Sequence, residues 1–522
     1  MELNLVVPVE PGAMREKGDE DIRGRLWRVT GPYKQDQIKD LTFHCISYVW
    51  GPGVAELGSF FDCKRPISDK TRPALEAAIK AAESLKRDDR EHKVEKVEAF
   101  WIDALCIPQM ETTLREKEAR QATLESMGYI YSTAVSVIIV LKGPIWNIIE
   151  TATTGKSPSP CKLSDLQVLE QDRWISRVWT YQELVNGADT YFATMNPGVG
   201  TPVVQVQRFL NCVGASLYKW KKENEQGEIG VLETFPRLSI LEDALGDILM
   251  SGYLQRTALG VLSNIGLRDV DPDYPQNRLL ACLGALTKEA SWNASSGDLA
   301  QIADKLMKIC EARNDYSFIY TSDRRSDEPG RRWRPSTTQK ERTTQKDLKE
   351  SHPLIPIINW HIWTPNPGLL GATQNGHLDE RGLWLDNMVR LQRFKSVDQK
   401  AIKELEVYLF GSTDPENPNH VLIGVFKPDM AASLHWRDAL LKFLLKIGFT
   451  GCRTPLTCDL GLFYSQIDIQ AFEEVEIFAA SSIVWKFGHP GLARWKEDGV
   501  AKYCAGVYTG LIKQEAESVL ML

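Results

Sequence analysis

The residues best suited to chemistry lie in one short run, residues 171–187, which reads QDRWISRVWTYQELVNG. Between Arg173 and Asn186 this run combines aromatic and basic side chains with one acid, Glu183, which follows Trp179 by four positions. Residues four apart lie on the same face of a helix, so this carboxylate and this indole would sit one turn apart. Such a pair could hold a cationic or sugar-like group. The alternative is a helix that packs on the core through its tryptophan and leaves a solvated glutamate beside it.

The same run contains the signals for a helix. Asp172 is suited to the N-cap position, Asn186 and Gly187 are suited to the C-terminal stop, and no proline or glycine interrupts the residues between them. We therefore expect one helix of about three turns. Arg177 lies only two positions before Trp179, so these two side chains point to different faces.

Three strand-like segments precede this helix and alternate with helical patterns. The strand-like segments are rich in β-branched and aromatic residues, and the segments between them repeat apolar residues at spacings of three and four. Alternating strands and helices form right-handed crossovers, which predicts an α/β fold with a doubly wound parallel sheet. The expected strands are residues 41–50, 99–107 and 134–141, and the expected helices are residues 68–85 and 114–131.

In such a sheet, ligands bind at the carboxyl ends of the strands. Ser47 and Trp50 lie at the end of the first expected strand, and Asp103 lies near the end of the second. Glu183 lies on the helix that follows the third. Topology alone therefore brings polar and aromatic groups from separate segments to one edge, and this convergence predicts a binding site there.

Two other nucleophiles are less favoured. Cys106 and His44 could form a thiol nucleophile with its base, but a buried apolar cysteine and a histidine inside a strand explain the two residues better. Ser47 lacks the G-x-S-x-G turn that exposes a hydrolase serine.

Composition describes a chain without a strong electrostatic or redox bias. Its 522 residues exceed one ordinary domain, and 62 basic against 69 acidic residues give a net charge of −7. This balance argues against nucleic acid as a partner of the whole chain. The ten cysteines form no C-x-x-C pair, so we expect neither a metal site nor a secreted disulfide framework. With no signal-peptide pattern and no apolar run of about 20 residues, we expect a cytoplasmic location and no membrane partner.

Four sequence blocks, in order, resemble those of the fungal heterokaryon-incompatibility (HET) domain. They are ISYVWG at residues 46–51, WIDALCIPQ at 101–109, MGYIY at 127–131 and RVWTYQE at 177–183. Proline stands at position 108 where the family pattern usually has asparagine, and LKG stands at 141–143 where it usually has WLG. Weaker similarity continues in NRLLACLG at 277–284 and AGVYTG at 505–510. The resemblance implies a role in regulated cell death after non-self recognition.

A more distant similarity suggests the chemistry. The spacing from Ser176 through Trp179 and Glu183 to Leu184 is similar to the W-x-x-x-E-L helix of TIR domains. In TIR domains that cleave NAD, this glutamate is catalytic, which implies a catalytic role for Glu183 in a TIR-like first domain. NAD would then be a substrate rather than a cofactor.

The site residues keep alternative interpretations. Cleavage of the nicotinamide–ribose bond creates an oxocarbenium-like centre, which a carboxylate such as Glu183 stabilises. Trp50 and Trp179 could stack on a pyridinium or adenine ring, although we favour core packing for each. Asp103 could bind a ribose hydroxyl or cap the following turn. Arg177 could neutralise a pyrophosphate, although pairing with an acid is the interpretation we favour.

Three function classes remain open from the sequence. The first is an effector of regulated cell death that cleaves NAD. The second is a non-enzymatic death or signalling adaptor that self-associates or binds a protein partner. The third is a specialised-metabolism enzyme that uses the same fold. For the first class we expect a nucleotide as the small-molecule partner, Glu183 as the catalytic residue and contacts from Ser47, Trp50, Asp103, Arg177 and Trp179.

The remaining chain divides by pattern. Helical periodicity dominates the part after the first domain, a polar stretch rich in Arg, Lys, Ser and Thr follows, and short alternating runs then predict a small β-rich domain. We expect an N-terminal segment at 1–23, the HET (TIR-like) domain at 24–212, a helical region at 213–321, a polar linker at 322–350 and the β-rich domain at 351–522.

Overall fold

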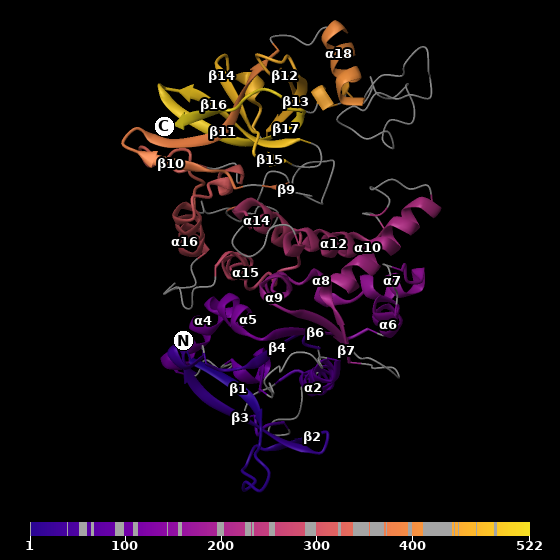
Figure 1. Cartoon of the computed structure of the whole chain (residues 1–522). Helices are drawn as coiled ribbons and strands as arrows, with labels where there is room; N and C mark the ends of the chain where they lie inside the picture. Colours follow the sequence, from indigo (N-terminus) through magenta and orange to yellow (C-terminus); the bar gives the residue numbers. More distant parts are fainter. Residues whose placement is uncertain are drawn as a thin grey trace. The chain divides into compact units, whose positions relative to one another are not determined.

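The computed structural model of the chain divides into two compact units, which are described separately (Figure 1). The first unit comprises Met1–Tyr253 and Arg268–Ser295, and the second comprises Leu254–Leu267 and Ser296–Leu522. The structure describes the chain except for residues 1, 39, 52–59, 64–66, 89–98, 108–112, 144, 155–158, 196–202, 225–230, 232–233, 250–255, 288–298, 322–324, 338–353, 355–369, 372, 395–398, 411–440, 443, 447, 466 and 485–487.

A mixed sheet forms the centre of the first unit. In the described residues its strand order is β2-β3-β1-β5-β4-β6-β7-β8. Strands β5, β4, β6 and β7 run parallel, and every pairing that involves β1, β2, β3 or β8 is antiparallel. The strands are β1 (Glu2–Pro8), β2 (Glu20–Ile22), β3 (Arg25–Lys34), β4 (Phe43–Tyr48), β5 (Ala99–Ile102), β6 (Ser136–Leu141), β7 (Thr190–Thr194) and β8 (Val203–Gln205).

This unit is α/β and contains parallel strands, as predicted, but the predicted doubly wound parallel sheet is extended by antiparallel strands at both ends. Residues 1–23, which we expected to precede the domain, supply β1 and β2, and β1 pairs with β5. Leu3, Leu5 and Val6 of β1 are buried. This short apolar run ends at Pro8, and a run of that length carries too little periodicity to indicate a strand from sequence.

Helices cover both faces of the parallel strands, which explains why every residue of β4 and β6 is buried. Neighbouring residues of β4 contact opposite layers. The hydroxyl of Tyr48 hydrogen-bonds that of Thr71 on α2 (Thr71–Asp88), whereas Ser47 hydrogen-bonds Glu183 on α9 (Thr180–Asn186). Figure 1 shows α2 on one side of the sheet and α9 on the other, beside α5 (Met127–Thr133).

Two expected elements are interrupted. The helix expected at 114–131 is α4 (Leu114–Glu125) followed by α5, and between them the hydroxyl of Ser126 donates to the carbonyl of Ala122 at 2.6 Å. The strand expected at 99–107 is β5 followed by a short helix, α3 (Asp103–Cys106). An apolar run without glycine does not distinguish a strand from a buried helix, so the pattern concealed this change.

Further helices pack in the layer of α5 and α9. α10 lies against α6, α7 and β7, α12 lies against α8 and α9, and α15 lies against α5 and α9. No helix within the described ranges is long and apolar enough to cross a membrane. The remaining helices of this unit are α1 (Gln35–Ile38), α6 (Trp146–Thr154), α7 (Leu163–Glu170), α8 (Arg173–Ser176), α10 (Val206–Glu223), α12 (Pro236–Leu249) and α15 (Asn277–Leu286).

Helices α5 and α15 approach each other through two glycines. A Cβ atom added at Gly128 would lie 2.2 Å from the backbone oxygen of Gly284. The same oxygen accepts a hydrogen bond of 2.7 Å from the Asn186 side chain on α9. One carbonyl of α15 therefore fixes the distance to α5 and the position of α9.

The second unit contains antiparallel strands, which confirms the predicted β-rich C-terminal part. Strand β11 pairs with β14 over Met388–Leu391 and with β12 at Gln392 and Arg393, so β11, β12, β13, β17, β16 and β14 form a closed ring. The strands of this unit are β9 (Leu370–Gly371), β10 (Gly376–Asp379), β11 (Gly382–Arg393), β12 (Thr450–Arg453), β13 (Leu460–Ser465), β14 (Val475–Ala480), β15 (Ile483–Val484), β16 (His489–Glu497), β17 (Val500–Gly510) and β18 (Glu517–Met521).

Helical segments accompany these strands. They are α14 (Ala258–Gly266), α16 (Leu299–Ala312), η1 (Ser317–Tyr320), α18 (Gln399–Phe410) and η4 (Ile469–Ala471). The alternating runs of the C-terminal part predicted short strands, among them residues 407–410 and 421–426, and one helix at 432–447. The prediction for 407–410 is wrong, because these residues form the end of α18. The strand expected at 421–426 lies outside the described residues, and of the helix expected at 432–447 only 441, 442 and 444–446 are described, as helix.

Part of the stretch expected as a polar linker is packed rather than solvated. Trp333 is buried, and the guanidinium of Arg334 donates to Asp304 at 2.6 Å and to Glu311 at 2.9 Å, both on α16. One tryptophan and one paired arginine anchor a segment whose overall composition is polar. Residues 322–324 and 338–350 of this stretch lie outside the described residues.

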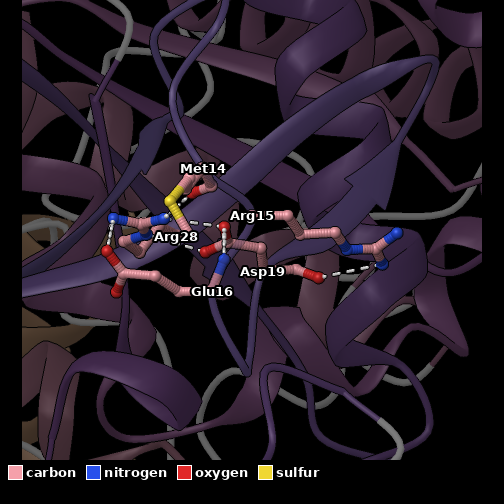
Figure 2. A network of polar contacts seen from close by, with 5 residues as sticks. All are labelled: Met14, Arg15, Glu16, Asp19 and Arg28. Atoms are coloured by element: carbon pink, nitrogen blue, oxygen red, sulfur yellow. Dashed lines mark hydrogen bonds and ion pairs between the residues drawn. The ribbon is translucent and has the colours of Figure 1, made fainter.

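Figure 2 shows how the loop between β1 and β2 is tied to β3. Arg28 donates from Nε and Nη2 to the two carboxylate oxygens of Asp19, each at 2.7 Å, and from Nη1 to Glu16 at 2.5 Å. Arg28 also reaches the carbonyl of Met14, and Arg15 donates to the carbonyl of Asp19. Hydrogen bonding by Arg28 lowers the pKa of the buried Asp19 carboxyl from 3.8 to about 2.

Replacing this carboxylate tests the contribution of the network. Asp19→Asn removes the charge that receives both Arg28 bonds, so the midpoint of thermal unfolding at pH 7 should fall by about 2–5 °C. Because the native pKa is depressed, the stabilisation is complete above about pH 4 and is lost as the pH falls toward 2. The difference in the midpoint of thermal unfolding between wild type and Asp19→Asn should therefore become smaller below pH 4. Asp21→Asn, an exposed neighbour, is the control, and a gap that persists unchanged to pH 3 would contradict this account.

The glycine contact gives a second prediction. Replacing glycine by alanine inside a helix ordinarily stabilises by about 1 kcal/mol. Gly128→Ala should instead destabilise by about 1–3 kcal/mol, because its Cβ would meet the rigid backbone of α15. Urea unfolding measures the change, and Ser132→Ala on the same helix should be close to neutral. Equal free energies of unfolding for Gly128→Ala and Ser132→Ala would show that α5 can move away from α15 without loss of stability.

Candidate functional site

Ser47 stands near the carboxyl end of β4, the central parallel strand. Its neighbour Ile46 pairs with Ile102 of β5, and Ser47 itself pairs with Ile139 of β6. The Ser47 hydroxyl donates to the carboxylate of Glu183 and accepts a 2.7 Å hydrogen bond from the indole Nε1 of Trp174. One serine thus connects the strand edge to both helices of the 171–187 run.

Glu183 is a buried acid with two hydroxyl donors. Its exposed fraction is 7%, and Tyr131 on α5 donates to its carboxylate in addition to Ser47. Trp174 and Tyr131 are themselves wrapped by aromatic rings, with Phe192 at 5.6 Å and Trp101 at 5.5 Å between centroids, both edge-on. Aromatic rings therefore pack against Tyr131, a donor to Glu183, and against Trp174, the indole that donates to Ser47.

Burial raises the pKa of Glu183 from 4.5 to about 7, and the negative charge of Asp103 adds to this rise. The hydrogen bonds from Ser47 and Tyr131 and the positive charge of Arg177 act in the opposite direction. At neutral pH the carboxyl group is therefore divided between its protonated and ionised forms, a condition suited to proton transfer or to a switchable charge.

A second pair lies at the same strand edge. The indole Nε1 of Trp50 donates to both carboxylate oxygens of Asp103, at 3.1 and 3.2 Å. Asp103 is the first residue of α3 and also accepts from the amide of Ala104 at 2.7 Å. Burial raises the pKa of Asp103, and the bond from Trp50 opposes that rise. Asp103 is thus already engaged by a neighbouring side chain and by its own helix.

The expectation of one continuous helix over 173–186 is wrong. The run forms α8 and α9, with Arg177 extended between them. A strand-like contact with Asp269 causes the break, because the amide of Asp269 donates to Ser176 O at 2.6 Å and the amide of Val178 donates to Asp269 O at 3.0 Å. The hydroxyl of Ser176 also donates to the Asp269 carboxylate at 2.6 Å.

Arg268 completes this junction from the preceding position. Its Nη1 donates to the carbonyl of Ile175 at 2.8 Å and to the hydroxyl of Thr180 at 3.1 Å. Its guanidinium carbon lies 5.5 Å from the centre of the Tyr181 ring. The buried cation therefore holds the end of α8 and the start of α9 in a fixed relation, and α9 carries Glu183.

Asp172 fastens the other end of α8, as its predicted N-cap role requires. One carboxylate oxygen accepts from the amide of Trp174 at 3.0 Å. The other accepts from the amides of Lys142 and Gly143 at 3.0 and 3.2 Å, directly after β6. Asp172 therefore fixes the position of Trp174 relative to the end of β6.

The structure thus brings most of the expected site residues to one edge. Ser47 contacts Glu183 directly, Trp50 contacts Asp103 directly, and the charges of Asp103 and Arg177 act on the pKa of Glu183. Trp179 is half-buried at the N-cap of α9, and the tryptophan that reaches Ser47 is Trp174.

Sequence reasoning missed Trp174 and Tyr131 as members of the site. Trp174 lies in the 171–187 run and Tyr131 lies in the MGYIY block, each beside other aromatic residues that could make the same contacts. The one available signal is general: a buried indole or phenol needs a hydrogen-bond partner, and Ser47 and Glu183 were the nearby candidates. To identify which aromatic residue hydrogen-bonds Ser47 or Glu183, one must know that the 171–187 run forms two helices and not one.

The less favoured nucleophile pair has other partners. His44 Nδ1 lies 2.8 Å from the hydroxyl of Ser136, and the His44 ring packs at 5.4 Å from Phe100. The Cys106 sulfur accepts from the amide of Ile102 at 3.5 Å inside the core. Among the described residues, no group of three His, Cys, Asp or Glu side chains is arranged to hold a metal ion.

Comparison with known proteins gives a family match over the part of the chain that holds Ser47 and Glu183. No curated protein and no solved structure matches the chain. A family model described as "Heterokaryon incompatibility protein (HET)" matches residues 43–183, a span that starts with β4 and ends at Glu183. Ser47, Tyr131, Trp174 and Glu183 all lie within it, whereas Arg268 lies outside. Residues 43–183 of this chain are therefore similar to the heterokaryon-incompatibility (HET) family.

Proposed function

We propose that this protein acts in heterokaryon incompatibility as an effector of regulated cell death after non-self recognition. The HET domain supports this role. The parallel strand order β5-β4-β6-β7, with helices on both faces, supports a TIR-like arrangement of that domain. Site chemistry is then expected at the carboxyl ends of the strands, where Ser47 and Asp103 lie.

We further propose that the domain cleaves the N-glycosidic bond of NAD with Glu183 as the catalytic residue. The observation that carries this proposal is the Glu183 carboxylate itself, which is buried at the strand edge and hydrogen-bonded by Ser47 and Tyr131. A carboxylate in an apolar enclosure interacts strongly with a developing ribosyl cation, because little water screens it.

Each neighbour has a defined part in this chemistry. The bond from nicotinamide to ribose breaks with its electron pair moving to the nicotinamide nitrogen, and water then adds to the ribosyl carbon and loses a proton. Ionised Glu183 stabilises the cation, and Ser47 orients the carboxylate. The half-buried Trp50 offers a ring face to a base while its nitrogen binds Asp103. Arg177 supplies positive charge for a pyrophosphate.

One observation favours a second candidate, a non-enzymatic adaptor that works through self-association. Only 7% of Glu183 is exposed, and its donors Ser47 and Tyr131 come from the protein's own core. Under this alternative the cluster fixes α9 against β4 and has no substrate to meet. Enzymatic and structural roles of the same residue therefore predict different behaviour of a conservative variant.

Glu183→Gln separates the two candidates. Glutamine preserves size and one acceptor but removes the charge that would face the ribosyl cation. If Glu183 is catalytic, release of nicotinamide from NAD by the purified full-length chain should fall by about two to three orders of magnitude. For the wild type, the rate should rise as the pH passes through about 7, because the ionised form is the active one.

Glu125→Gln is the matched control. Glu125 is also a buried glutamate of the first unit, 5% exposed, and it accepts from Gln121 on its own helix α4. It should retain wild-type activity. Wild-type protein without NAD cleavage, combined with full cell-killing activity of Glu183→Gln in cells, would replace the enzyme proposal with the adaptor.

The raised pKa gives a prediction that holds for both candidates. The native pKa of about 7 exceeds the ordinary 4.5, so the native state favours the protonated acid. Its contribution to stability is complete below about pH 4.5 and is lost as the pH rises through 7. Relative to Glu183→Gln, the wild type should therefore lose about 3 kcal/mol between pH 4.5 and 8. Urea unfolding at several pH values measures this difference, and a constant difference would mean that the carboxyl is not buried in solution.

A further inference from the structure

Two cysteines from distant parts of the first unit lie side by side. Cys161 precedes α7, and Cys212 lies on α10. Both are joined to the side chain of Ser216, whose hydroxyl oxygen lies 3.2 Å from the Cys161 sulfur and donates to the carbonyl of Cys212. Cys161 is half-buried and Cys212 is 1% exposed, so solvent reaches the pair from the side of Cys161.

Ser216, one helical turn after Cys212, holds the two backbones together. Its hydroxyl accepts from the amide of Cys161 at 2.8 Å and donates to the carbonyl of Cys212 at 2.6 Å. The same oxygen lies 3.2 Å from the Cys161 sulfur. On the other side, the Cys212 thiol donates to the carbonyl of Ser159 at 3.1 Å. The loop before α7 is therefore fastened to α10 beside both cysteines.

The two sulfurs differ in reactivity. Interaction with the Cys212 and Ser216 side chains lowers the pKa of Cys161, although burial opposes this effect. The bond to Cys161 and burial raise the pKa of Cys212. Because the thiolate is the nucleophile, Cys161 is the accessible attacking sulfur and Cys212 is the resolving one.

We propose that Cys161 and Cys212 form a reversible disulfide, a redox switch of the HET-bearing unit, with glutathione disulfide as the oxidant. The Cys161 thiolate attacks one sulfur of glutathione disulfide and releases one glutathione thiolate. The Cys212 thiol then loses its proton and attacks the sulfur of Cys161, which releases the second glutathione. Two protein thiols lose two electrons and two protons, and one glutathione disulfide becomes two glutathione molecules.

This bond would close a covalent loop around the segment that carries Glu183. The loop from residue 161 to residue 212 contains α7, α8, α9, β7 and β8. Cross-linking a loop of roughly 50 residues removes conformational freedom mainly from the unfolded chain and so stabilises the native fold. The oxidised protein should hold α9 more firmly, and the reduced protein should release it more readily. The inference does not depend on NAD cleavage.

The test uses the purified, reduced, full-length chain and glutathione disulfide. After incubation, N-ethylmaleimide blocks remaining thiols, and trypsin releases peptides for mass spectrometry. We expect residues 157–162 joined to residues 209–219, with a mass two hydrogens below the sum. Dithiothreitol should separate them. The midpoint of thermal unfolding should be higher in the oxidised protein by on the order of 5–10 °C.

Single variants identify the order of steps. Cys212→Ser should accumulate glutathione on Cys161, because the resolving sulfur is missing, and Cys161→Ser should leave Cys212 unmodified. Cys63→Ser, which removes another half-buried thiol, should form the Cys161–Cys212 link as the wild type does. Wild-type protein that carries glutathione on Cys161 without the cross-link, or that pairs other cysteines, would overturn the proposal. The wild-type peptide map decides the matter even if a variant fails to fold.

Discussion

Burial of an ionised carboxylate costs free energy, and the elements around Glu183 in the first unit are arranged to supply the hydrogen bonds that offset this cost. Its charge can be tolerated only if donors reach it, and these come from β4 through Ser47 and from α5 through Tyr131. The donor from β4 is in turn held by Trp174 of α8. Four separate elements must therefore adopt one geometry together, and misplacement of any of them leaves a buried acid without partners. This mutual dependence gives the site its precision.

The supports of this cluster extend beyond the segment that the family model matches. The HET match ends at Glu183, yet Arg268 fixes the start of α9 and the carbonyl of Gly284 anchors its end through Asn186. Strand β1, which precedes the matched residues, likewise pairs with β5. The matched residues contain the Ser47–Glu183 contact, while segments on both sides hold α9 and β5 in place. The HET sequence blocks are thus the core of a larger folding unit.

Sequence patterns predicted what depends on local order and missed what depends on distant contacts. The alternation of strands and helices placed Ser47, Asp103 and Glu183 at one edge, because the ends of parallel strands must meet there. The N-cap at Asp172 was predictable from residue type alone. The break at Arg177 was not, because it results from pairing with Asp269, far along the chain. The hydrogen bond from Trp174 to Ser47 also joins residues far apart in the sequence, and β1 was too short to show a period.

The closed ring of the second unit determines when that unit can be completed during synthesis. Strand β11 pairs with β18 and β14, both made about a hundred residues later, so it leaves the ribosome long before either partner exists. When β11 emerges, β10 is the one described strand of this sheet already available to it, and the backbone groups that pair with β14 and β18 have no partner strand, a state that invites pairing with other chains. Such non-local pairings also fold slowly. The interval between β11 and β18 is therefore the period in which a nascent chain of this protein most needs a chaperone.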